Sequence, residues 1–286
     1  MARDLFMSER RAIGESPILR VLLILAAAAF LFLGLILPLA FLAAQAFAAG
    51  WSGYFGSLTA PDTASSIRLT LLIAAFVVPA NTLFGLAASW CIAKFRFPGR
   101  AALLTVIDLP ISVSPVIAGL VFVLIFGAQG WLGPVLTSHG IRVIFAVPGL
   151  VLATAFVTVP FVARQLIPLM EQQGSDEEEC ALVLGATGLQ TFWRVTLPNI
   201  RWGLLYGVLL CNARAMGEFG AVSVVSGHIR GATMTMPLQV EALYQDYNSV
   251  AAFAVASLLA LLAVMTLVVK RLVEWHHRRE TAIQSA

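Results

Sequence analysis

Long, uninterrupted apolar runs dominate the chain. Six of them reach the length of about 20 residues that a helix needs to cross a bilayer: 21–49, 69–93, 109–141, 143–163, 202–227 and 249–269. Apolar residues follow one another in these runs, whereas the strands of a membrane barrel would alternate between apolar and polar residues. The pattern therefore predicts an all-α membrane protein with six transmembrane helices.

Prolines interrupt the third and fourth runs. Pro110 and Pro115 are expected to break the early part of the third helix, and Pro160 is expected to kink the cytoplasmic half of the fourth. Proline inside a span is tolerated where protein or water satisfies the freed backbone groups. The third helix is therefore expected to face protein or a pore rather than lipid.

The composition agrees with a membrane protein and excludes several classes of function. The chain is 59% hydrophobic and only 12% charged, against about 25% charged residues in soluble domains. The three cysteines and four histidines form no disulfide or metal pattern. No phosphate-binding Gly-x-x-x-x-Gly-Lys-Ser/Thr loop occurs, so the chain is not expected to hydrolyse ATP or to be an enzyme by itself. We expect no cofactor.

Basic residues predict the orientation in the membrane. With the N-terminus in the cytoplasm, fourteen lysines and arginines fall on cytoplasmic segments and three on the opposite side. Both termini and the polar segment near residue 180 are then cytoplasmic. The basic pI follows from this topology, so no nucleic-acid partner is expected. The first apolar run resembles a signal peptide but exceeds the usual 7–15 apolar residues, which favours an uncleaved helix.

The one extended polar segment, about residues 171–201, is predicted to form a two-helix hairpin. Ser175 and Glu178 have the spacing of a capping box at the start of a first helix. Gly185 is expected to end that helix with a positive φ.

The second helix of the hairpin is predicted to start at Thr187, which pairs with Gln190 in another capping box. It is expected to end near Val195, because Pro198 cannot continue it. Its apolar residues are too numerous for a solvated loop: Leu189, Phe192, Trp193, Val195 and Leu197. Such a patch indicates a protein partner, or alternatively a hairpin that lies on the lipid surface.

The hairpin resembles the "EAA" motif of the permease subunits of bacterial ABC importers: Glu-Ala-Ala, three residues, Gly, nine residues, Ile-x-Leu-Pro. The matching residues are Glu179, Ala181, Gly185, Leu197 and Pro198. Cys180 and Val195 depart from the pattern, and both changes conserve size. The resemblance implies a type I ABC importer permease fold, with a cytoplasmic coupling helix that enters a groove on an ATPase.

Two further stretches resemble the sulfate, thiosulfate and molybdate permeases within this family, most closely the W-type subunit of sulfate/thiosulfate importers. They are residues 214–222 and residues 108–119. The resemblance implies a second permease subunit of the T type, two ATPase subunits that bind the ATP, and a periplasmic sulfate/thiosulfate-binding protein, all at the bacterial inner membrane. The alternatives are a permease for molybdate or another oxyanion and a gradient-driven secondary transporter.

Charged residues inside the predicted spans are candidates for a translocation path or gate, because charges at that depth face protein or water. Arg214 and Glu218 are four residues apart and share a helix face, where they either attract a passing anion or fix the helix against the other subunit. Asp108 is a further candidate, and its pairing with Arg214 is a hypothesis. The predicted path or gate also includes Gly217, Gly220, Pro110 and Pro115.

Three regions are predicted along the chain. Residues 1–64 hold a cytoplasmic lead, the first helix and an external segment. Residues 65–270 form the permease domain, and residues 271–286 form a basic cytoplasmic tail.

Overall fold

The computed structural model describes residues 17–284, and within them the chain is helical and contains no strand. The cytoplasmic lead is expected at residues 1–20, and its first 16 residues, with Arg3, Arg10 and Arg11, lie outside this range. The first half of the chain forms α1 (Pro17–Leu31), a π-helical turn η1 (Phe32–Ile36), α2 (Leu37–Ala46), α3 (Gly50–Thr59), α4 (Pro61–Lys94), α5 (Arg100–Ser112), α6 (Pro115–Phe126) and α7 (Gly133–Ser138). The second half forms α8 (Val147–Gln173), α9 (Asp176–Val183), α10 (Gly188–Thr191), a second π-helical turn η2 (Phe192–Thr196), α11 (Leu197–Met216), α12 (Gly220–Ser226), α13 (Met236–Gln245) and α14 (Ser249–Gln284).

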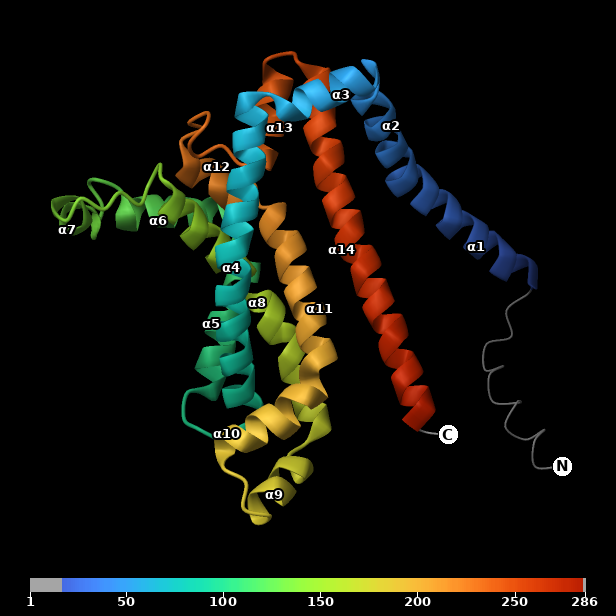
Figure 1. The fold of residues 1–286 in the computed structure, drawn as a ribbon, viewed down its shortest axis with the longest axis vertical. Coiled ribbons are helices and arrows are strands. Elements are labelled where there is room, and N and C mark those ends of the chain that lie inside the picture. The colour runs from blue at the N-terminus through green and yellow to red at the C-terminus, as the bar shows by residue number, and fades with distance from the viewer. Residues whose placement is uncertain (1–16, 285–286) are drawn as a thin grey trace.

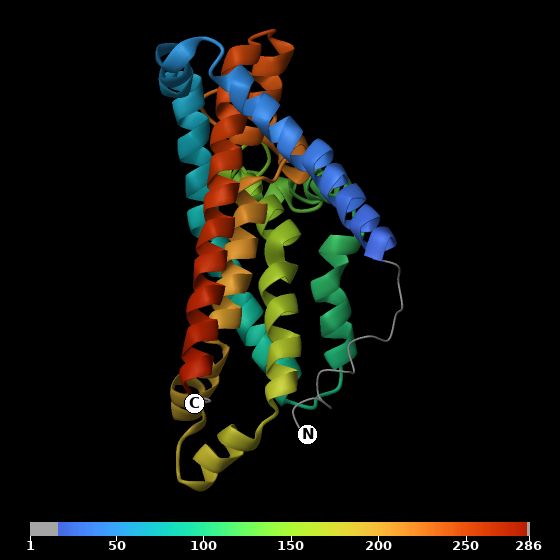
Figure 2. The ribbon, with the colours of Figure 1, turned by 90° about the vertical axis from the view of Figure 1, so that its right-hand side faces the viewer.

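Four helical segments of the described chain are long and apolar enough to span a bilayer: Ile18–Ala46, α4, α8 and Ser249–Val269. Two bent pairs pass the same test, α5 with α6 at 108° and Gly188–Met216 with α12 at 47°. Counting each bent pair as one span gives the six spans that the sequence predicts. Figures 1 and 2 show α4, α8, α11 and α14 along the long axis, whereas α6 and α7 extend to one side.

The break in the third span lies later than expected, and the span begins earlier. Helix α5 already starts at Arg100 and runs through Pro110, which is buried inside it. The chain leaves the helix at Val113 and Ser114, and Pro115 opens α6. A proline at the first position of a helix loses no intrahelical hydrogen bond, so the fold uses Pro115 as a start and tolerates Pro110 at the loss of one bond.

The core of the bundle lies where α4, α8 and α11 pack together. Val162, Leu166 and Met170 of α8 form an apolar cluster with Ile200 and Cys211 of α11, all buried. The core therefore joins α8 to α11, the helix that follows the polar segment.

Helices α4 and α8 also hold each other through a buried polar contact. The Asn81 side-chain amide donates to the Ala155 carbonyl at 3.0 Å and to the Thr158 hydroxyl at 2.8 Å. Gly85 permits the close approach, because a Cβ there would lie 2.7 Å from the Cβ of Val162. The two helices thus form one closely packed unit.

The two π-helical turns each come directly before a Leu-Pro pair, at Pro38 and at Pro198. The expectation that Pro198 ends the second helix of the hairpin is wrong, because the helix continues through it from Gly188 to Met216. A proline ring normally clashes with the carbonyl four residues earlier. Here the Leu197 N–H bonds to the Phe192 carbonyl, five residues back, and this wider turn accommodates the ring.

Candidate functional site

The polar segment forms a hairpin at one end of the molecule, and α1 and α14 both point toward that end (Figure 1). Helix α9 closes with a Schellman motif around Gly185, whose φ is +90°. The Gly185 N–H donates to the Leu182 carbonyl, and the Ala186 N–H donates to the Ala181 carbonyl. The predicted role of Gly185 as a helix terminator is confirmed.

The two predicted capping boxes differ in outcome. At Thr187 the box is complete, since the Gln190 side chain accepts from the Thr187 N–H at 2.9 Å and the Thr187 hydroxyl accepts from the Gln190 N–H. At Ser175 the prediction is wrong, because no side-chain cap forms there and the Ser175 hydroxyl donates to Glu179 instead, at 2.6 Å. The carboxylate of Glu178 is engaged elsewhere.

Large apolar side chains are exposed on the hairpin. Val183 and Leu184 are 88% and 87% exposed, and Leu189 and Trp193 are 70% and 59% exposed. Leu182 is also exposed, at 50%, and five exposed apolar side chains on one short hairpin are typical of a surface that another protein covers. Leu182, Val183 and Leu184 are not among the apolar residues that the sequence predicts for the patch, although they stand directly before the terminating glycine.

The other apolar residues expected in the patch, Phe192, Val195 and Leu197, are half-buried, and Phe192 and Leu197 face the bundle. The Phe192 ring lies 5.2 Å from the ring of Trp90 on α4. Leu197 packs against the apolar cluster shared by α8 and α11. These side chains fix the second half of the hairpin to the membrane helices.

The residues that match the "EAA" motif differ in their exposure. Glu179 and Pro198 are exposed, whereas Ala181 and Leu197 are half-buried. Ala181 and Gly185 line a groove between α9 and η2, together with Leu184, Ala186, Gln190, Thr191, Arg194 and Val195.

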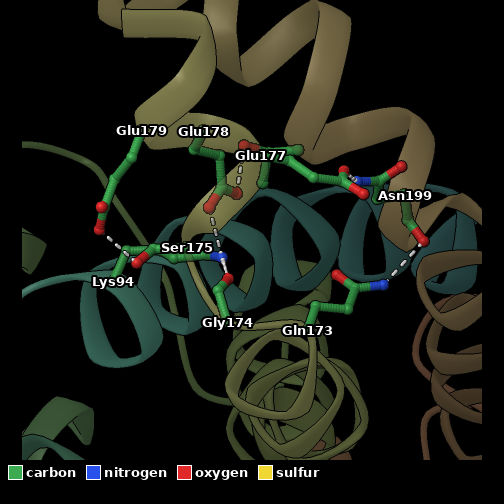
Figure 3. A network of polar contacts seen from close by, with 9 residues as sticks. Lys94, Gln173, Gly174, Ser175, Glu177, Glu178, Glu179 and Asn199 are labelled. Carbon is green, nitrogen blue, oxygen red and sulfur yellow. Dashed lines mark hydrogen bonds and ion pairs between the residues drawn. The ribbon is translucent and has the colours of Figure 1, made fainter. Parts of the chain in front are cut away.

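A polar network anchors α9 to three other segments (Figure 3). The Lys94 ammonium, at the end of α4, lies 2.6 Å from the Glu178 carboxylate and also donates to the Gly174 carbonyl. Glu178 accepts a second bond from the Thr196 hydroxyl at 2.9 Å. The Asn199 side chain donates to Glu177. The sequence does not indicate Lys94 as a partner of α9, because Lys94 enters the sequence pattern only as one of the basic residues that predict the orientation.

Arg214 and Glu218, whose spacing places them on one helix face, contact each other. Nη1 of Arg214 lies 2.8 Å from Oε2 of Glu218, whose side chain is 1% exposed. This contact is an ion pair without directional hydrogen-bond geometry. The other oxygen of Glu218 accepts from the Ala221 N–H at 2.9 Å and so caps α12. Glu218 thereby holds the two helices together across their 47° bend.

Asp108 does not pair with Arg214, so that hypothesis is wrong. Its carboxylate lies 2.7 Å from Nε of Arg164 on α8, and both side chains are about half exposed. Arg164 lies nine residues before the end of α8, about 13 Å inside the helix. Its expected place in a cytoplasmic segment, as one of the fourteen basic residues, is therefore wrong.

The remaining candidates lie at the two helix breaks. Gly217 ends α11, and Gly220 begins α12. A Cβ on Gly220 would lie 3.0 Å from the Cβ of Pro115, so the start of α12 adjoins the start of α6. The structure therefore brings the breaks of the third and fifth spans together, while Pro110 lies one helical turn away inside α5. In the described part of the chain no group of acidic, histidine or cysteine side chains could hold a metal ion.

Comparison with known proteins gives consistent matches. Residues 81–281 match the family described as "Binding-protein-dependent transport system inner membrane component". The chain is 54% identical over 255 residues to the sulfate transport system permease protein CysW of Synechococcus elongatus, covering 88% of this chain and 89% of the relative. It is 53% identical to CysW of Escherichia coli K12 (84% and 83% covered), and 35% identical to the sulfate transport system permease protein CysT of the same organism (83% and 86%).

A solved structure shares the fold. It is a bacterial ABC transporter involved in the import of the acidic polysaccharide alginate, with a TM-score of 0.72 at 20% identity, covering 91% of this chain and 95% of that one.

Proposed function

Because the chain belongs to the family of binding-protein-dependent transport system inner membrane components, we propose that it is one of two membrane-spanning permease subunits of an ATP-driven sulfate importer. The high identity to sulfate permeases over most of the chain supports sulfate as the substrate. The chain is similar to both CysW and CysT of Escherichia coli K12, which supports a second, related but different permease subunit of the T type. Thiosulfate, a close chemical analogue, is proposed as a second substrate.

The exposed hairpin is the observation that carries the coupling part of the proposal. Its apolar side chains, led by Val183 and Leu184, are proposed to enter a groove on a cytoplasmic ATPase subunit. Two such ATPase subunits would bind the ATP, and a periplasmic binding protein would deliver the anion. Closure of the ATPases would then shift the permease pair between inward-facing and outward-facing populations.

The proposed orientation puts the hairpin and both termini in the cytoplasm of a bacterium, with the permease in the inner membrane. The basic residues near the hairpin support this, since Lys94, Arg100, Arg194 and Arg201 belong to the same end of the molecule.

The breaks in the third and fifth spans are the proposed gate. Gly220 and Pro115 adjoin there, and the Glu218 ion pair lies at the same bend. Arg214 keeps about a third of its side chain exposed and so offers positive potential close to the break. The half-exposed pair of Asp108 and Arg164 lies at membrane depth, where a charged pair is expected to face water or protein.

A single substitution in the reconstituted complex tests the proposal. Gly185→Asp puts a charged side chain at a φ of +90°, where L-residues are strained, without any clash. We expect normal membrane insertion, loss of the co-purifying ATPase, and loss of ATP-dependent uptake of radiolabelled sulfate. Gly188→Asp, at the start of α10 with open space around it, is the matched control and should retain uptake. A Gly185→Asp complex that still couples ATP hydrolysis to uptake would refute the coupling role.

A further inference from the structure

Helix α9 has no hydrophobic anchor in the bundle. None of its eight described residues is buried. It follows Gly174, whose φ of +69° marks a sharp change of chain direction after α8. Something other than apolar packing must therefore hold α9 in a fixed position against the membrane helices.

Side chains of the bundle bind the carboxylates of α9 instead. Glu178 has both oxygens engaged, Oε2 by Lys94 at 2.6 Å and Oε1 by Thr196 at 2.9 Å. The Lys94 and Glu178 side chains are only 10% and 15% exposed. Exposed ion pairs contribute little to stability, but a shielded pair with further hydrogen bonds is strongly damaged when one partner is removed. Figure 3 shows this pair joining α9 to the end of α4.

We infer that Lys94 is a positioning residue that fixes α9, the proposed coupling helix, to α4. A displacement of α9 is then transmitted directly to α4. The inference rests on the proposed function, because it presumes that an ATPase moves α9. The Lys94 ammonium also binds the Gly174 carbonyl, so one side chain ties the ends of α4 and α8 to α9.

Helix α4 is suited to pass such a displacement on. It is one continuous helix of 34 residues, although Pro79 inside it removes one intrahelical hydrogen bond. Near its other end, the Thr70 hydroxyl accepts the N–H of Met236 at the start of α13, at 2.9 Å. Twenty-four residues separate Lys94 from Thr70, which corresponds to about 36 Å of helix. A movement that reaches α4 at Lys94 therefore acts on α13 at the opposite end of the molecule.

The test uses the full complex in vesicles and measures three quantities: co-purification of the ATPase, ATP hydrolysis, and sulfate taken up per ATP hydrolysed. In Lys94→Met and Glu178→Gln, the exposed apolar patch is untouched, so we expect the ATPase to co-purify and to hydrolyse ATP. Uptake per ATP should fall about tenfold or more, as expected for a shielded pair that loses one partner. Lys94→Arg, which retains the charge, should restore most of the ratio.

Glu171→Gln is the matched control. Glu171 makes an ion pair with Arg100 at the same end of the molecule, but that pair is nearly half exposed and does not contact α9. Its uptake per ATP should remain within about twofold of the wild type. An unchanged ratio in Lys94→Met would overturn the inference. So would loss of the ATPase from Lys94→Met, because Lys94 would then be required for docking. Failure of the proposed function has a separate signature, since the wild-type complex would then show no ATPase or no sulfate uptake.

A cross-link tests whether the contact between Lys94 and Glu178 stays closed during transport or must open. Cysteines at Lys94 and Glu178, in a background with Cys91→Ser and Cys180→Ala, can be joined by a short thiol reagent. We expect the cross-linked complex to transport sulfate, because the inference requires the two residues to move together. A complex that is locked by the cross-link and recovers when a cleavable reagent is reduced would overturn it.

Discussion

Glu218 is expected to be the most sensitive charged residue of the described membrane helices. Its side chain is 1% exposed, caps α12 through the Ala221 N–H, and lies 2.8 Å from Arg214. Glu218→Gln keeps the shape and the cap but removes the charge. Because Arg214 is 35% exposed and partly solvated, the loss should be about 1–2 kcal/mol, less than the 3–5 kcal/mol of a fully buried pair.

Glu218→Ala also removes the cap, which contributes about 1 kcal/mol, and leaves a void at the bend. The total loss should be about 3–4 kcal/mol. Both variants can be measured by titrating the purified chain in mixed micelles with SDS and following tryptophan fluorescence. Glu241→Gln is the control, since that carboxylate is about one-third exposed, lies 3.7 Å from His228, and should contribute less than about 0.5 kcal/mol. If alanine proves no more destabilising than glutamine, the cap does not contribute as argued. If both variants match the control, the ion pair does not contribute either.

Three further substitutions test the packing and the hairpin. Gly85→Val would place a side chain against Val162 at the contact of α4 with α8, so the same titration should show a loss of about 2 kcal/mol, and an unchanged midpoint would contradict the close packing. Asn81→Leu removes both hydrogen bonds to α8 and should lower stability by about 1 kcal/mol, the usual size for a polar contact between membrane helices; a neutral result would show that these bonds add nothing. Gly185→Ala introduces strain of about 1 kcal/mol at its positive φ, so the affinity for the ATPase in a binding titration should fall about fivefold. Gly188→Ala should bind like the wild type, and equal affinities of the two variants would contradict the argument.

The features that depend on neighbours along the chain were predictable from the sequence. Long apolar runs indicated the spans, and Gly185 and the Thr187 capping box follow from local chemistry. The failed capping box at Ser175 shows the limit of such arguments. Glu178 has the right spacing for the box, but Lys94, 84 residues earlier in the chain, binds its carboxylate instead. A rule based on the spacing of neighbouring residues cannot predict a cation that is far away in the sequence.

Two further errors have equally specific causes. The expectation that Pro198 stops a helix assumes hydrogen bonds between residues four apart. In the structure the turn before Pro198 is a π-turn, with a hydrogen bond between residues five apart. The sequence favours the wrong arginine for Asp108, because the helical rise gives the depth of a residue in the membrane but not the direction that its side chain faces. Only the packing of α5 on α8 brings Arg164 to it.

The continuity of the helix from Gly188 to Met216 has a mechanical consequence. Its first turns belong to the hairpin, and its last turn carries Arg214 and leads to the bend at Glu218. The segment is about 42 Å long, so a tilt of about 10° around one end moves the other end by about 7 Å. It can therefore act as a lever arm, because a rotation of about 10° near the hairpin becomes a displacement wider than an oxyanion at the far end.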